Sequence, residues 1–167
     1  ILMVTATTFM FYSLQKFDLV DIYVVFFTAP LIVSLLSAYF LKDILSTKGI
    51  LLMLLSFGSI IYSLGPSMRI FSLDLIFPIV PPICWALYQF FTKVVSGDND
   101  PFAAIFYTSI LGAIIFSVFI FFNWVPLEKN IFWLYLIILG VAGFVSHSLI
   151  IYAIQLSNLS FVTNFQY

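Results

Sequence analysis

Apolar residues fill long uncharged stretches of this chain, and the charged residues lie in short segments between them. A helix needs roughly 20 apolar residues to cross about 30 Å of hydrocarbon, because each residue adds about 1.5 Å. The stretches therefore predict membrane-spanning helices. The longest predicts two, at about 131–156 and from about 160, because polar residues interrupt it. The uncharged stretches cover residues 1–15, 22–41, 49–68, 75–92, 101–127 and 130–167.

Both ends of the sequence lie inside apolar runs. We therefore expect a fragment of a longer chain, which holds the end of one helix, five complete helices and the start of a seventh. The opening run has neither a basic start nor a small-residue cleavage site, so it is not typical of a signal peptide. The fold class that follows is an all-α polytopic membrane protein, built as a helical bundle.

The composition agrees with this fold class. Hydrophobic residues make up 63% of the chain and charged residues 8%, with a mean hydropathy of +1.20, whereas soluble domains have about 25% charged residues. This excludes most soluble enzymes, and a net charge of −1 without a basic patch argues against nucleic-acid binding. One cysteine and one histidine cannot form a metal cluster, and no known catalytic motif is present. We therefore expect no catalytic residues, no metal site and no cofactor.

Prolines predict where the spanning helices are irregular. Pro30 lies within the second span, and Pro78, Pro81 and Pro82 crowd the first turns of the fourth. Proline removes a backbone donor, so these positions predict kinks or local unwinding, with or without a role in transport. The basic residues do not orient the helices, because three lie in the loops on each side.

Two further features have structural interpretations. Ser109, Ala113 and Ser117 recur every four residues, a spacing that favours close packing between helices. Lys93 lies close to the end of its span, where we expect its ammonium group to reach the membrane surface.

A weak internal repeat is found when the sequence is shifted by 140 residues. A hydroxyl residue, Tyr12 and Gln15 then align with a hydroxyl residue, Tyr152 and Gln155. Each set lies on one face of its helix, which should turn toward the bundle interior. Five helices separate the two copies, so the copies would cross the membrane in opposite directions. Inverted repeats of this kind are common in secondary transporters, whose substrate site lies near mid-membrane between the halves.

A second polar face lies on the fourth span, where Trp85, Tyr88, Gln89 and Thr92 share one stripe. Aromatic walls with neutral hydrogen-bonding groups suit a small, partly apolar solute, or a cation held against the rings. The alternative is that the aromatic residues lie at the membrane interface and Gln89 bonds a neighbouring helix. His147, the one ionisable residue well inside a span, could bind solute, carry a proton or bond across helices.

Several short motifs follow a shared pattern. They are Thr28–Leu31, Gly58 with Pro66, Trp85–Tyr88, Phe106–Thr108, Gly140, His147, Ala153, Ser160 and Phe165–Tyr167. On these motifs the chain resembles the EamA-type transporters of the drug/metabolite transporter superfamily. Three positions depart from the family pattern, which has Gly at Lys42, Glu at Asp43 and commonly Pro at Asn164.

The resemblance implies a ten-helix, inverted-repeat transporter with two five-helix halves. Residues 1–68 would be the end of the first repeat, from its third to its fifth helix, and residues 73–167 the start of the second, from the sixth helix into the ninth. The loops with Lys42, Lys48 and Lys93 would face the cytoplasm. The resemblance also implies transport of a small organic metabolite or drug-like solute, in a membrane that we expect to be the bacterial inner membrane.

These patterns together predict a secondary transporter that works by alternating access. Its expected partners are the solute, the lipid bilayer and, as a candidate assembly, a second copy in a homodimer. The alternatives are a polytopic membrane enzyme, which would need clustered acids or histidines, and a non-transporting scaffold, whose polar faces would pair and leave no cavity. An open pocket between the fourth and sixth spans would separate transport from scaffolding. The predicted substrate-binding residues are Trp85, Tyr88, Gln89, His147, Tyr152, Gln155, Tyr12 and Gln15.

Overall fold

The computed structural model describes residues 1–43, 47–64, 74, 76–95, 101–122, 124–163 and 165. Within these residues the chain forms helices and no strands, so the predicted all-α fold class is confirmed. The helices are α1 (Leu2–Leu14), α2 (Leu19–Phe26), α3 (Ala29–Leu36), the π-helical turn η1 (Ser37–Leu41), α4 (Thr47–Leu64), α5 (Ile76–Val95), α6 (Pro101–Phe122), α7 (Ile131–Leu156) and α8 (Leu159–Thr163).

Each uncharged stretch of the sequence carries a helix at the expected place. Leu19–Leu41, Phe102–Phe122 and Ile131–Leu156 are long and apolar enough to cross a membrane. The predicted division of the longest stretch is also confirmed, because α7 ends at Leu156 and α8 begins at Leu159. Pro66 of the family motif and the departure at Asn164 lie outside the described residues.

The second span is broken next to Pro30, as predicted. The α-helix stops at Phe26 and resumes at Ala29, which places Pro30 in the first turn of α3. In the gap, the Thr28 N–H bonds the Val25 carbonyl oxygen at 3.0 Å, three residues back instead of four. Proline has no N–H to continue the helical ladder, so it is accommodated where a new helix begins.

The prediction of local unwinding in the fourth span is wrong. Helix α5 continues without interruption through Pro78, Pro81 and Pro82, and all three rings are buried. The first of these prolines needs no intrahelical partner because it lies in the first turn. The other two are enclosed by protein, which is where a membrane helix tolerates the carbonyl groups that proline leaves unpaired.

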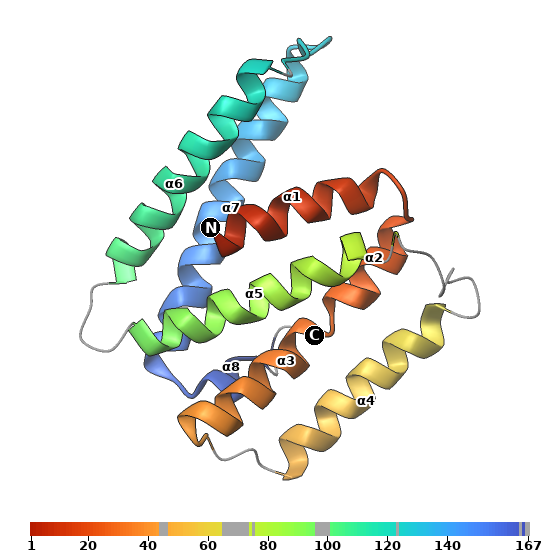
Figure 1. Cartoon of the computed structure of the whole chain (residues 1–167), viewed down its shortest axis with the longest axis vertical. Helices are drawn as coiled ribbons and strands as arrows, with labels where there is room; N and C mark the ends of the chain where they lie inside the picture. Colours follow the sequence, from red (N-terminus) through yellow and green to blue (C-terminus); the bar gives the residue numbers. More distant parts are fainter. Residues whose placement is uncertain are drawn as a thin grey trace.

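Helix α5 is the centre of the molecule, because it contacts α1, α2, α3 and α7. Figure 1 shows α1 and α5 side by side, with their chains running in opposite directions. A core below them joins α3, α5, α7 and α8, and so joins the two predicted repeats. Its buried members are Val33, Ala86, Ile154, Leu159 and Val162.

Helices α6 and α7 form a hairpin that extends beyond the other helices (Figure 1). Only 6% of the most apolar window of each is buried within the chain. The small residues Ser109, Ala113 and Ser117 of α6 are all exposed. Within the described part of the chain this stripe does not pack closely against another helix, so its role in helix packing stays a prediction.

An ion pair links the two predicted repeats near the beginning of α5. The Lys16 ammonium group, in the turn after α1, pairs with the carboxylate of Asp74. It also lies 4.7 Å from the ring centre of Phe77, where a cation is attracted to the aromatic face. Both partners of the ion pair are about half exposed, at 43% and 50%.

Candidate functional site

Two of the predicted site residues form an aromatic pair on α5. Trp85 stacks on Tyr88, with ring centres 5.9 Å apart, and it also meets Phe26 of α2 at 6.2 Å. One turn separates the two residues along α5, so their rings leave the helix on the same side. The pair therefore forms an aromatic surface that α2 covers at one edge.

His147 of α7 completes this surface. Its Nε2 atom lies 2.9 Å from the Tyr88 hydroxyl oxygen, and its ring stacks on the Tyr88 ring at 5.5 Å between centres. The Trp85 ring centre is 5.9 Å from the imidazole. The structure thus brings together Trp85, Tyr88 and His147, which with Phe26 we call the aromatic cluster.

The hydrogen bond to Tyr88 determines which nitrogen of His147 can bind a further group. A neutral imidazole has one donor and one acceptor nitrogen, and a tyrosine hydroxyl can take either role. Because Nε2 is used by Tyr88, Nδ1 is the nitrogen that can meet a further polar group. The ring is half-buried, so such a group must come from the side that the aromatic cluster does not cover.

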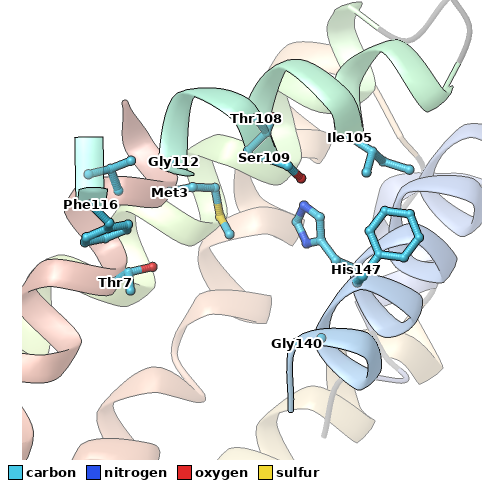
Figure 2. Close-up of a pocket in the computed structure, with 12 residues that line it drawn as sticks. Met3, Thr7, Ile105, Thr108, Ser109, Gly112, Phe116, Gly140 and His147 are labelled. Carbon is cyan, nitrogen blue, oxygen red and sulfur yellow. The ribbon is translucent and has the colours of Figure 1, made fainter. Parts of the chain in front are cut away.

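A cavity of about 300 Å³ lies on that side, between α1, α6 and α7. Figure 2 shows the imidazole of His147 pointing into it, toward Thr108 and Ser109 of α6. The walls are mostly apolar, and their polar groups are the imidazole and a few hydroxyls. The lining residues are Met3, Val4, Thr7, Ile105, Thr108, Ser109, Gly112, Phe116, Gly140, Gly143, Phe144 and His147.

Glycines leave the space for this cavity. Gly140 and Gly143 lie on the same face of α7 as His147, and Gly112 lies opposite on α6. A Cβ atom at any of the three glycines would meet nothing within 4 Å. Our sequence reasoning missed the role of Gly112 and Gly143. The available signal was the spacing of Gly140, Gly143 and His147, which places all three on one helical stripe.

Three other predicted residues lie on the same two helices as Tyr88 and His147. Gln89 is fully buried on α5, next to Tyr88 in the sequence. Tyr152 is half-buried and packs edge-on against Phe102 of α6, with ring centres 5.8 Å apart. Gln155 is half-buried in the last turn of α7.

Tyr12 and Gln15 lie apart from the aromatic cluster. Both are exposed, and they line a separate hollow of about 210 Å³ between α1 and α6, together with Phe116. The Tyr12 ring meets Phe77 at the beginning of α5, at 5.9 Å. Trp85 lies roughly 12 Å further along that helix at the usual rise per residue. The structure therefore does not bring these two residues to His147.

The cavity also lies in a different place from the one predicted. We expected an open pocket between the fourth and sixth spans, which are α5 and α7. Those two helices are instead joined by the bond between Tyr88 and His147. The cavity lies on the other side of His147, where α1 and α6 replace α5 as its walls.

The Lys93 side chain contacts the end of α7, a partner that the sequence did not predict. Its ammonium nitrogen lies 2.7 Å from the carbonyl oxygens of both Ile154 and Ser157. These carbonyl oxygens belong to the end of α7, where the helix leaves its last acceptors unpaired. The partial negative charge of this helix end stabilises the ammonium group.

A comparison with protein-family models matches residues 73–167 to a family described as the EamA-like transporter family. The matched segment runs from just before α5 to the end of the chain, and so includes Trp85, Tyr88, His147 and Lys93. No curated protein and no solved structure matches the chain.

Proposed function

Because this chain belongs to the EamA-like transporter family, and is therefore an integral membrane protein of a transporter family, we propose that it is a secondary transporter. It moves a small organic solute across the membrane by alternating access. The solute binds in the cavity beside His147, and the aromatic cluster holds the imidazole in place.

The main support for this proposal is that His147 bonds a polar partner on one side and faces open space on the other. Its Nε2 atom is engaged by Tyr88 at 2.9 Å, and its ring also forms part of the wall of a 300 Å³ cavity. A scaffold would pair its polar groups without leaving such a space. The walls come from α1 of the predicted first repeat and from α6 and α7 of the second, which is where inverted-repeat transporters bind their substrates.

The cavity wall favours a particular kind of solute. Its volume is at the small end of ligand pockets, which begin at about 300 Å³. The lining has hydroxyls, one imidazole and apolar side chains, and no carboxylate or ammonium group among the described residues. A small solute with an apolar body and one polar end fits this combination best.

The test is solute flux in cells that express the protein. Two probes represent the metabolites and drug-like solutes that the family resemblance implies: radiolabelled amino acids with apolar side chains, and the aromatic cation ethidium. We expect His147→Ala to lower the flux of the transported probe roughly tenfold, and Tyr88→Phe to lower it less, because it removes one hydrogen bond and keeps the ring.

The matched control is Tyr135→Phe, which makes the same change at an exposed position of α7. It should leave flux unchanged. The amount of each variant in the membrane is measured in parallel, so that lost flux is separated from lost protein. Equal flux in His147→Ala and the unchanged protein would reject the site. No flux of either probe by well-inserted protein would reject transport of these solutes.

A further inference from the structure

Lys93 connects α5 to the end of α7. Its ammonium nitrogen lies 2.7 Å from the carbonyl oxygens of Ile154 and Ser157, and 3.5 Å from that of Gln155. Helix α7 ends at Leu156, so these acceptors come from its last turn and from the residue that follows it.

The chemistry of a helix end explains why a lysine binds there. The last four carbonyl groups of a helix have no intrahelical donor, and the end carries a partial negative charge. An ammonium group has three donors and can meet up to three carbonyl oxygens at once. Within the described part of the chain, the Lys93 nitrogen meets carbonyl oxygens and no carboxylate.

This contact is one polar connection between α5 and α7. Another is the hydrogen bond between Tyr88 and His147. Along α5 the two connections are roughly 7 Å apart, and along α7 roughly 10 Å, at the usual rise per residue. Apolar packing between Ala86 and Ile154 also holds the two helices together, but such packing is not directional. Polar connections at two levels restrain the register of α7 on α5 more than one connection does.

We propose that Lys93 is a positioning residue for His147. By binding the end of α7, it keeps that helix in register on α5, so that the imidazole stays against Tyr88 and points into the cavity. The role in transport rests on the function proposed above, but the effect on the position of His147 does not.

The chain offers a direct way to test this, because His147 is its one histidine. Histidine labelled with ¹⁵N therefore gives a single pair of imidazole signals in membrane-reconstituted protein, without interference from other residues. Tyr88→Phe defines the Nε2 signal that results when the hydrogen bond is lost. We expect Lys93→Met, which keeps most of the apolar stem and removes the ammonium group, to move the signal toward that reference.

Two variants complete the experiment. Lys93→Arg keeps a cation with several N–H donors, so it should restore most of the original signal. Lys48→Met removes an exposed lysine from α4 and should have no effect. If Lys93→Met does not accumulate in the membrane, Lys93→Leu, which also lacks an N–H donor, replaces it in the comparison.

Flux is measured on the same variants with the two probes named above. We expect Lys93→Met to lower flux roughly tenfold and Lys93→Arg to recover it. An imidazole signal that stays unchanged in Lys93→Met would overturn the positioning role. A shifted signal in a protein whose unchanged form moves neither probe would support the positioning role and reject transport of these solutes.

Discussion

At the scale of single residues, Lys42 has an unusual backbone conformation. It follows η1 with φ 56° and ψ 29°, in the left-handed region, and it is the one non-glycine residue with positive φ in the described chain. Its N–H bonds the Ser37 carbonyl oxygen, while the Ser37 hydroxyl donates to the carboxylate of Asp43. A tight turn therefore requires a conformation that glycine adopts at no steric cost. This agrees with the family pattern described above, which has Gly at the position of Lys42.

We predict that Lys42→Gly stabilises the protein by about 1 kcal/mol, because it removes the steric cost of the left-handed conformation. The measurement is the free energy of unfolding in mixed detergent micelles. Lys48→Gly is the control, since Lys48 has ordinary helical geometry at the beginning of α4 and glycine weakens helices. Stabilisation by both substitutions, or by neither, would contradict this explanation.

Two hydroxyl groups meet where α3 packs on α8. The Ser34 and Thr163 hydroxyl oxygens are 2.9 Å apart and buried, and the Thr163 hydroxyl also lies 3.0 Å from the Ser160 carbonyl oxygen. Thr163 has one hydroxyl proton, so when it donates to that carbonyl, Ser34 must donate to Thr163. The Ser160 hydroxyl is buried and has no partner among the described residues.

These hydroxyls should respond differently to substitution. Ser34→Ala removes a buried hydrogen bond and is expected to destabilise the protein by about 1 kcal/mol. Ser160→Ala removes a buried hydroxyl that makes no such bond, so it should be neutral or stabilising. Unfolding free energies of the two variants provide the measurement. Greater destabilisation by Ser160→Ala would show that its hydroxyl has a partner and that this description of the cluster is wrong.

At the scale of elements, the cavity depends on one face of α7. Gly140 and Gly143 provide no side chains there, and His147 follows on the same stripe. Replacing either glycine by a large residue would fill the space beside the imidazole. Helix α4 offers a comparison, because a Cβ atom at Gly58 would also meet nothing within 4 Å, away from the cavity.

We predict that Gly143→Leu inserts normally and loses most of its solute flux, because the side chain occupies the cavity. Gly143→Ala adds a single methyl group to open space and should keep flux while strengthening the helix. The control is Gly58→Leu, which adds the same side chain to α4 and should keep both insertion and flux. Flux retained by Gly143→Leu would show that solute does not pass this face.

The sequence was sufficient to predict the spans because a bilayer imposes a length on every apolar helix. It also predicted the break at Pro30, because the N–H that proline lacks interrupts the helix at that position. It could not predict which sides of α6 and α7 meet α1, since apolar residues surround both helices almost evenly. The partner of Lys93 was also hidden, because the end of α7 lies 61 positions away along the chain.

The candidate site was likewise predictable from the sequence only in part. Trp85, Tyr88 and His147 could be singled out because polar and ring-bearing side chains are conspicuous inside apolar spans, but of these three only His147 lines the cavity. The cavity was not, because glycine carries no side-chain chemistry that marks a binding site. Tyr12 and Gln15 were placed at the site by analogy with the repeat, but their helix directs them to a hollow beside Phe116.

At the scale of the whole molecule, the polar ends of the helices separate to two sides. Figure 1 shows the ends of η1, α5 and α7 gathered at the lower left and the turn between α6 and α7 at the top. Lys42 and Lys93 belong to the first group, and Lys129 to the second. This agrees with the sequence-based prediction that successive loops lie on opposite sides of the membrane. The basic residues did not decide which side is inside the cell, because their numbers on the two sides are equal.

Cysteine labelling tests this arrangement. Cys84 is buried and is the one native cysteine, so Cys84→Ala provides a background without native thiols. In that background, we expect Lys42→Cys and Lys129→Cys to react with a membrane-impermeant maleimide from opposite sides of the membrane. The family resemblance places Lys42 inside the cell. Labelling of both positions from one side would contradict the arrangement of the spans.

The polar contacts at the two ends of α5 respond differently to dissolved salt. The ion pair between Lys16 and Asp74 is about half exposed, so dissolved salt screens it over a distance of about 8 Å at physiological ionic strength. The contact of Lys93 at the other end joins an ammonium group to half-buried main chain and is screened less. If the molecule rocks about its centre, ionic strength changes the balance between the two end states of that motion. Concentrated salt would loosen the end with Asp74 and leave the other end closed.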